Sequence, residues 1–371
     1  MNRKQIIRQA AVLAGCLVFL SAAGVLGSGI DDFLTGTVFK PDVSGLSLSK
    51  RMAAAESAFQ KSGGGDLFFI GYVFQSRHTI EWGDSHGRSG TYTVTVSKDS
   101  IKMKRPSRQE ENRHMSSDEG GEPAGLLVLQ KKSGRATEIL GIQLMDLDNA
   151  YAFNEIPLYW LGEADTDESL AWLENTYARS EHNVRKDVIF LAYSHDSDRS
   201  FDFLEKVALS DTSTKLRKDA IFWIGNLKSA YSLALLKNIM ARETDTEVRK
   251  QVVFALHLSD DENAVRELIH LARQDKSSAV RKQAIFWLGQ KATKESTRAL
   301  KDFVENDEST EVKKQAVFAI SQLPDKEAVP LLIDISRNHK NLEVRKNAMF
   351  WLGQKDSEEA LKLFEEILLK K

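Results

Sequence analysis

A twelve-residue stretch, VRKQAIFWLGQK at 280–291, recurs almost unchanged as VRKNAMFWLGQK at 344–355. A looser copy, VKKQAVFAISQL, lies halfway between them at 312–323. The first apolar residue of the stretch repeats every 32 residues, in Val184, Leu216, Val248, Val280, Val312 and Val344. A fixed period of this length is typical of stacked repeat proteins, in which each unit packs on a copy of itself. No other feature constrains the fold as strongly.

Each repeat contains two helical patterns. The first is the quoted stretch, and the second has its own core column at Leu204, Leu236, Leu268, Leu300, Leu332 and Phe364. An imperfect early copy of the first pattern, FNEIPLYWLG, occupies 153–162. Polar residues suited to N-caps stand three positions before the periodic apolar residue, at Ser213, Asp245, Ser277, Ser309 and Asn341. The pattern predicts a mainly α fold, with an α-solenoid of about six to seven repeats over residues 153–371.

An acidic residue lies six positions before the basic residue of most repeats. The pairs are Asp211 and Arg217, Glu243 and Arg249, Asp275 and Arg281, and Asp307 and Lys313. Together with the pattern VR..A...LG, this resembles HEAT repeats, in the short form first named from phycobilisome lyases. The resemblance implies a right-handed superhelix with a structural ladder of acid–base pairs between neighbouring repeats. The pattern departs from the family at its ends, where Arg179 and His339 replace the acid.

Tryptophan recurs at twice the repeat length. The column Trp160, Trp223, Trp287 and Trp351 alternates with Leu191, Ala255 and Ala319. Large and small residues at one site let neighbouring repeats interdigitate without overpacking. We therefore predict a two-repeat packing unit; the alternative interpretation is a cofactor-binding box.

A strip of phenylalanine and lysine runs along an outer face, away from the predicted core. At about 100° per residue, Phe286 falls nearly opposite the centre of the buried face and Lys282 lies beside it. This Phe–Lys strip comprises Phe190, Phe222, Phe254, Phe286, Phe318 and Phe350 with Lys186, Lys218, Lys250, Lys282, Lys314 and Lys346. It is a candidate docking surface for an acidic, partly apolar partner. The alternative is simple packing, with each Phe against the adjacent repeat under a lysine stem.

Residues 1–27 have the features of a targeting segment. Arg3, Lys4 and Arg8 precede an uncharged, apolar stretch, which predicts a secretory signal cleaved after Ala23 or Gly27. A retained membrane anchor and a lipoprotein lipidated at Cys16 are the alternatives. All three predict an exported protein in the periplasm or cell envelope of a bacterium. Loss of the three basic residues changes the formal charge from -2 to -5, and Cys16 is the only cysteine, so a mature chain can form no disulfide.

Residues 31–150 have a different pattern. A helix is predicted over 47–62, and strand-like segments follow at 66–76, 91–97, 100–105, 125–130 and 137–147. We predict a small α+β domain with an antiparallel sheet, and a mobile loop over 106–123 because that stretch has few apolar residues. The junction Pro157-Leu158-Tyr159-Trp160-Leu161-Gly162 also resembles exported bacterial proteins in which a small β domain leads into HEAT repeats.

The sequence gives little support for catalysis or for a cofactor. No phosphate-binding glycine loop or nucleophile elbow is present. Some HEAT-repeat proteins are di-iron hydroxylases with His-Glu pairs, but no histidine here precedes glutamate. His78, His86 and His114 lie near Glu81, Asp84 and Glu110, a weak candidate metal site in polar loops.

The expected function is therefore a non-catalytic, protein-binding scaffold or adaptor without a cofactor. The charge balance gives no reason to expect nucleic acid as a partner, and membrane contact is expected only through residues 1–27. The alternative is an enzyme or enzyme subunit, a hydrolase or metal-dependent, with its site between the β domain and the solenoid.

Overall fold

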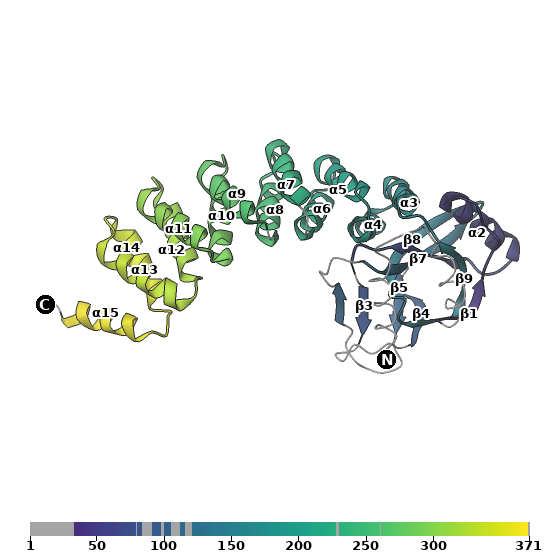
Figure 1. Ribbon diagram of the computed structural model, residues 1–371, viewed down its shortest axis with the longest axis horizontal. Coiled ribbons are helices and arrows are strands. Elements are labelled where there is room, and N and C mark those ends of the chain that lie inside the picture. Colours follow the sequence, from purple (N-terminus) through teal and green to yellow (C-terminus); the bar gives the residue numbers. More distant parts are fainter. Residues whose placement is uncertain are drawn as a thin grey trace, which may run out of the picture.

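The protein is described from a computed structural model that covers residues 33–78, 80–83, 91–97, 100–104, 112–115, 121–227, 230–259 and 261–369. A β domain stands at one end of a curved array of helices (Figure 1). Residues 1–27, predicted to be a targeting segment, lie outside the described residues, as do parts of the predicted 106–123 loop. Within that loop, Asn112–Met115 forms strand β6, paired with β3 (Ile80–Gly83). Within the described residues, no helix is both long and apolar enough to span a bilayer.

The β domain is built on a mixed sheet, so the expectation of an antiparallel sheet was wrong. Its strands are β1 (Leu34–Phe39), β2 (Leu67–Gln75), β4 (Thr91–Ser97), β5 (Ser100–Lys104), β7 (Pro123–Ser133), β8 (Ala136–Met145) and β9 (Ala150–Glu163). The order is β5-β4-β9-β2-β7-β8, and β1 pairs with β9 off this path. Hairpins β4–β5 and β7–β8 are antiparallel, whereas β9 runs parallel to β1, β2 and β4.

Strand β9 also corrects the predicted domain boundary. The segment 153–162, assigned to the first helical repeat, forms most of this strand, and the helical array begins at α3 (Thr166–Arg179). Trp160 therefore belongs to the sheet rather than to the tryptophan column; Gly71 pairs with it from β2. The helix α2 (Leu48–Ser62) was predicted correctly and lies against β2 and β9.

The helical array consists of antiparallel helix pairs. After α3 come α4 (His182–Ser194), α5 (Arg199–Ser210), α6 (Thr214–Asn226), α7 (Ala230–Arg242), α8 (Thr246–Leu258), α9 (Glu262–Gln274), α10 (Ser278–Lys291), α11 (Lys294–Asn306), α12 (Thr310–Ser321), α13 (Asp325–Asn338), α14 (Leu342–Leu352) and α15 (Glu358–Leu369). Predicted N-caps Ser213, Asp245, Ser309 and Asn341 accept backbone hydrogen bonds, and Ser277 does not. The structure is thus a solenoid, as the repeat predicted, preceded by a β region, as the strand-like segments predicted.

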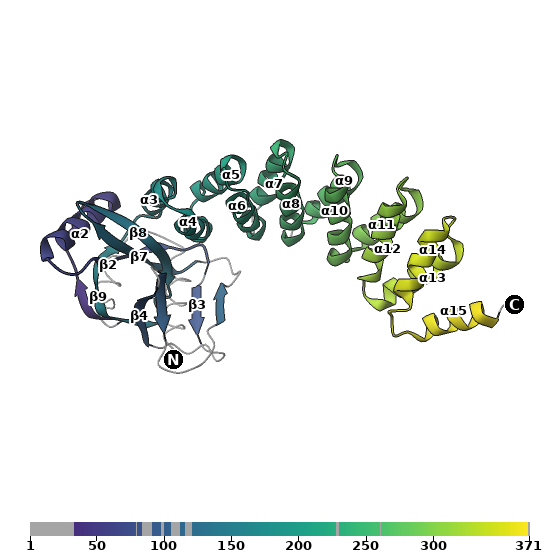
Figure 2. The ribbon, with the colours of Figure 1, turned by 180° about the vertical axis from the view of Figure 1, so that it is seen from behind.

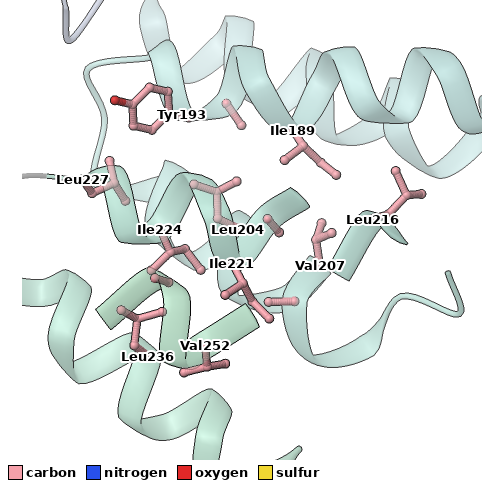
Figure 3. Packing of buried hydrophobic residues seen from close by; sticks show 14 of the residues in the cluster. Ile189, Tyr193, Leu204, Val207, Leu216, Ile221, Ile224, Leu227, Leu236 and Val252 are labelled. Carbon is pink, nitrogen blue, oxygen red and sulfur yellow. The ribbon is translucent and has the colours of Figure 1, made fainter. Parts of the chain in front are cut away.

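The array is curved, and its two layers of helices differ. Successive even-numbered helices from α4 to α14 pack closely on one another, while the odd-numbered helices fan apart. Both views place α4, α6, α8 and α10 along the inner side of the curve and α5, α7 and α9 along the outer side (Figures 1 and 2). The apolar columns meet between the layers, where Leu204, Ile221 and Leu236 are fully buried (Figure 3).

Close glycine contacts explain why the sequence repeats most faithfully after two units. A Cβ added to Gly289 would lie 2.7 Å from the carbonyl oxygen of Ala319, and one added to Gly225 would lie 2.8 Å from the Cα of Ala255. Helices that carry Trp-x-Gly therefore press against alanine in the next inner helix. Alternate interfaces differ, so a packing unit contains two repeats.

Candidate functional site

The Phe–Lys strip lies on the inner, concave side of the array rather than on an outer face of the curve. All its residues belong to the even-numbered helices α4 to α14. Phe190, Phe222, Phe254, Phe286 and Phe318 are half-buried between neighbouring repeats, while Phe350 is 58% exposed on the last inner helix. The expected packing role is thus visible, and each ring still presents part of its surface.

Aromatic rings along this face repeat their geometry every two units. The rings of Phe190 and Trp223 are 5.0 Å apart between centroids, those of Phe254 and Trp287 are 4.9 Å apart, and those of Phe318 and Trp351 are 4.8 Å apart. Interplanar angles are 47°, 44° and 46° in the same order. The half-buried tryptophans thus form part of the inner face, in contact with the strip.

Part of the lysine charge on the strip is balanced locally. Lys250 pairs with Glu247 at 3.1 Å, Lys314 with Glu311 at 3.2 Å and Lys346 with Glu343 at 3.2 Å. These are exposed pairs one helical turn apart, which contribute little to stability and exchange readily with a ligand's charge. Lys186, Lys218 and Lys282 belong to the same column without such a pair in the described structure.

A shallow cleft of about 360 Å³ opens on the inner face across three successive helices, α10, α12 and α14. Its lining combines two aromatic rings with charged and amide side chains. The lining residues are Lys282, Glu311, Lys314, Gln315, Phe318, Asn347 and Trp351. Four of these seven belong to the Phe–Lys strip or its glutamate partners. Gln315 and Asn347 were missed at the sequence level, although they recur at the same period one position after the lysines.

The acid–base ladder is formed across repeats rather than within the pairs six residues apart. Arg185 forms an ion pair with Asp211, Arg217 with Glu243 and Arg249 with Asp275, in each case with the acid of the following repeat. Each acid also accepts a backbone N–H that precedes the next helix, as Asp211 does from Ser213 at 2.7 Å. The six-residue spacing instead brings the arginine to the main chain of the preceding turn. Arg249 donates to the main-chain carbonyl of Glu243, and Arg281 donates to that of Asp275.

The ladder takes a different form at its C-terminal end. Asp307 accepts from the N–H of Ser309, and Lys313 donates to the carbonyl of Glu305 at 2.7 Å. His339 replaces the acid: its Nδ1 accepts from the N–H of Asn341 at 3.0 Å, and Arg345 donates to its carbonyl at 2.9 Å. Ion pairs between successive repeats are thus formed by Arg185, Arg217 and Arg249 with the following acid, while the C-terminal members contact the main chain of their own repeat.

The outer helices present a different surface from the inner ones. Ion pairs cross between neighbouring outer helices, for example Arg273 with Asp302 at 2.7 Å, and Arg266 with Glu295 at 3.6 Å. Opposite charges therefore satisfy one another on this side. The aromatic rings and the cleft distinguish the inner face as the better candidate surface.

The junction between the β domain and the solenoid contains a buried polar chain. Tyr72 Oη lies 2.9 Å from Ser169 Oγ, which lies 2.8 Å from Nε2 of His195, whose Nδ1 lies 2.7 Å from the carbonyl of Leu191. Because the carbonyl can only accept, Nδ1 carries the proton and Nε2 accepts from Ser169. All three side chains are fully buried. Burial lowers the pKa of His195 to about 4, so the ring is neutral at pH 7. This series of hydrogen-bonded side chains joins the two domains and has no solvent-exposed group.

Two further features of the β domain are weaker candidates for a site. A hollow of about 580 Å³ in the β domain lies between residues 40–46 and the end of β9, where Arg51 donates to the carbonyls of Leu161 and Glu163. It is larger than the inner cleft, but most of its lining residues belong to the single loop 40–46. Of the metal candidates, His86, Asp84 and Glu110 lie outside the described residues. No cluster of three potential metal ligands occurs in the parts of the chain that are described.

The comparison with protein families agrees with the geometry. HEAT repeats match the chain at residues 201–289, 233–316, 265–335 and 297–371. The four overlapping matches begin 32 residues apart, at the repeat length found in the sequence. None of the curated proteins compared with this chain matches it.

Several solved structures resemble part of the chain. Human deoxyhypusine hydroxylase in complex with glycerol aligns with 15% identity over 55% of this chain and 91% of its own, with a TM-score of 0.29. The Escherichia coli protein YibA aligns with 21% identity over 55% of this chain and 77% of its own, with a TM-score of 0.34. The complex of CpcE and CpcF of phycocyanin lyase from Nostoc aligns with 15% identity over 53% of this chain and 92% of that chain, with a TM-score of 0.32.

Proposed function

Because residues 201–371 are HEAT repeats, we propose that the protein is a non-catalytic scaffold that binds another protein along its concave Phe–Lys strip. The observation that carries the proposal is the asymmetry of the two helical layers. Outer helices join their charges across repeats, whereas inner helices present rings, lysines and a cleft. Aromatic side chains are enriched at protein interfaces, where they supply contact area. The lysines beside them would steer and orient an acidic partner through complementary charge.

The proposed location is the bacterial cell envelope, and it rests on residues 1–27 alone. Cell fractionation of the full-length protein should recover it with the periplasm or the membranes. Recovery in the cytosol would refute the location without bearing on the binding surface.

The binding function is tested by affinity capture from envelope extract. We compare the tagged mature protein with a variant in which Lys218, Lys250, Lys282 and Lys314 are changed to glutamate. A matched control makes the same change at four exposed lysines of the outer helices, Lys206, Lys237, Lys301 and Lys326. The proposal expects a partner retained by the parent and the control but lost by the inner variant. Capture by all three proteins alike would show that the strip only packs the repeats.

A further inference from the structure

The inner cleft is repeated in the sequence. Moving each lining residue back by 64 positions gives Lys218, Glu247, Lys250, Gln251, Phe254, Gln283 and Trp287. Six residue types are identical, and the seventh changes only from Asn347 to Gln283. The ring geometry and the lysine–glutamate distance also repeat, within 0.1 Å in each case (4.8 and 4.9 Å; 3.2 and 3.1 Å). The inner face therefore repeats the residues of the cleft on α10, α12 and α14 two repeats earlier, on α6, α8 and α10, and we treat the two sets as two subsites.

An amide column connects the two subsites. Gln251, Gln283, Gln315 and Asn347 occupy the same position on four successive inner helices, α8 to α14. These half-buried amides form no hydrogen bond with any other residue in the described structure, and Asn347 Oδ1 is buried without a partner. A primary amide donates and accepts at once, as a peptide group does. Four amides in a row, none of them hydrogen-bonded to another side chain or to the main chain of the described structure, therefore suit the backbone of an extended chain.

The spacing of the helices fixes the spacing expected in the ligand. Packed helices lie about 8–10 Å apart, and an extended chain advances about 3.3 Å per residue. One repeat therefore matches roughly three residues, and the two subsites, two repeats apart, match roughly six. Each subsite offers tryptophan and phenylalanine for an apolar side chain. Each also has two lysines against one glutamate, an excess of one positive charge.

We propose that the inner face binds an extended acidic polypeptide segment, with its backbone along the amide column and two apolar side chains about six residues apart in the two clefts. This proposal rests on the proposed function and specifies its ligand. The column changes to Asp219 and Asp187 towards the β domain, so the acidic segment lies over α8 to α14. Burial raises the pKa of Asp187 to about 6, so its carboxyl is still mostly ionised at pH 7, and that end of the face is unsuited to acidic residues.

The two subsites differ in one neighbour. The ring of His257 stacks on Trp287 at 4.4 Å, whereas Ser321 occupies the equivalent position before Trp351. The Trp287 indole therefore has one more ring partner than the Trp351 indole. We expect the Trp351 cleft to be the stronger subsite and the Trp287 cleft to add affinity through the linkage of the two.

The test uses the full mature chain and synthetic twelve-residue peptides rich in glutamate. One peptide has two leucines six positions apart, a second has them three apart, and a third has one leucine. Binding is measured by fluorescence anisotropy. We expect the first peptide to bind roughly tenfold or more tightly than the other two, because only it reaches both clefts. Equal affinity for all three, or no binding of any, would overturn the proposal.

Variants locate the peptide without disturbing the core. Replacing Gln315 and Asn347 with alanine should weaken the six-spaced peptide roughly three- to tenfold or more, from the loss of backbone hydrogen bonds. Gln290→Ala, an exposed amide on α10 outside the column, is the matched control and should leave affinity unchanged. Equal losses of peptide affinity in the double variant and in Gln290→Ala would show that the amide column does not bind the peptide backbone.

Other outcomes separate this inference from the proposed function. If a captured partner depends on the lysines but no peptide shows a spacing preference, the scaffold function stands and the extended-segment inference fails. If N-acetylglucosamine oligomers bind the clefts and peptides do not, the ligand is a glycan and both fail.

Discussion

At the residue scale, the arginine ladder gives the array its cohesion. Arg249 donates to the carbonyls of Met240 and Glu243 within its own repeat, and its guanidinium pairs with Asp275 of the next. Side-chain exposure is 10% for Arg249 and 0% for Asp275, so removing one partner leaves the other as a buried, uncompensated charge. The same side chain thus stabilises a turn and an interface between repeats.

Replacing Arg249 with alanine should lower the free energy of unfolding by about 3–5 kcal/mol. Arg266→Ala is the matched control, since its exposed pair with Glu295 should contribute no more than about 1 kcal/mol. Urea denaturation followed by circular dichroism measures both. Similar losses for the two variants would mean that burial of the ladder is unimportant.

His195 should make stability depend on pH. Its pKa is about 4 in the folded protein and near 6.5 when unfolded. Between these values the unfolded chain binds a proton that the folded chain does not, so stability falls as pH drops from 6.5 to 4. The loss should be roughly 3 kcal/mol relative to His195→Gln, which cannot take up the proton.

Asp187 acts in the opposite sense over part of this range, because its pKa is raised to about 6. Asp187 is present in both the parent and His195→Gln, so its contribution cancels when their free energies of unfolding are subtracted. The measurement is the free energy of unfolding of each protein from pH 7 to pH 4. A difference between them that stays constant over this range would contradict the prediction.

At the element scale, glycine sets how closely inner helices approach. Gly289 lies within helix α10, where alanine is intrinsically favoured by about 1 kcal/mol. Its position against Ala319 reverses that preference, because a methyl group would overlap the carbonyl oxygen. Helix propensity is thus outweighed by contact between neighbouring helices.

Gly289→Ala should therefore destabilise the protein by about 1–3 kcal/mol. Gly353→Ala is the control at the equivalent sequence position, immediately after the last inner helix, where the nearest atoms would be 3.5 Å from the new Cβ. Thermal unfolding of the two variants separates steric from intrinsic effects. An unchanged or more stable Gly289→Ala protein would show that the inner helices can separate freely.

At the scale of the whole molecule, the β domain closes the N-terminal end of the apolar array. Helix α4 packs against β8, and α3 packs against α2 and β2. Arg77, which follows β2, donates to the carbonyls of His195 and Ser197 and to Ser200 Oγ, and stacks over Phe201 at 4.7 Å. These contacts join the end of the sheet to the turn between α4 and α5.

Loss of the Arg77 contacts should loosen this junction before the rest of the chain. In Arg77→Ala, amide hydrogen exchange over residues 190–200 should accelerate roughly thirtyfold, from about 2 kcal/mol of lost charge-assisted hydrogen bonding. Arg199→Ala, the control, removes an exposed ion pair with Glu174 and should change the exchange rate of these amides less than about fivefold. Unchanged protection of these amides in Arg77→Ala would show that other contacts hold the β domain to the helical array.

The sequence by itself determined the repeat, its length and the HEAT-type solenoid. Each column recurs at one position of a helix, and helical spacing is a local property that neighbouring residues reveal. The same local signals located α2 and most strands of the β domain. The Phe–Lys strip could likewise be listed in full, since lysine and phenylalanine recur at the repeat length.

Only the tertiary structure decided which segments meet. Tyr159-Trp160 has the same local pattern as the helical repeats, yet it lies in β9 because β1 and β2, distant in sequence, pair with it. The partner of Arg217, the concave position of the strip and the cleft on α10, α12 and α14 depend on how one repeat stacks on the next. Strand pairing and curvature arise from contacts between distant residues, and these leave no fixed spacing in the sequence.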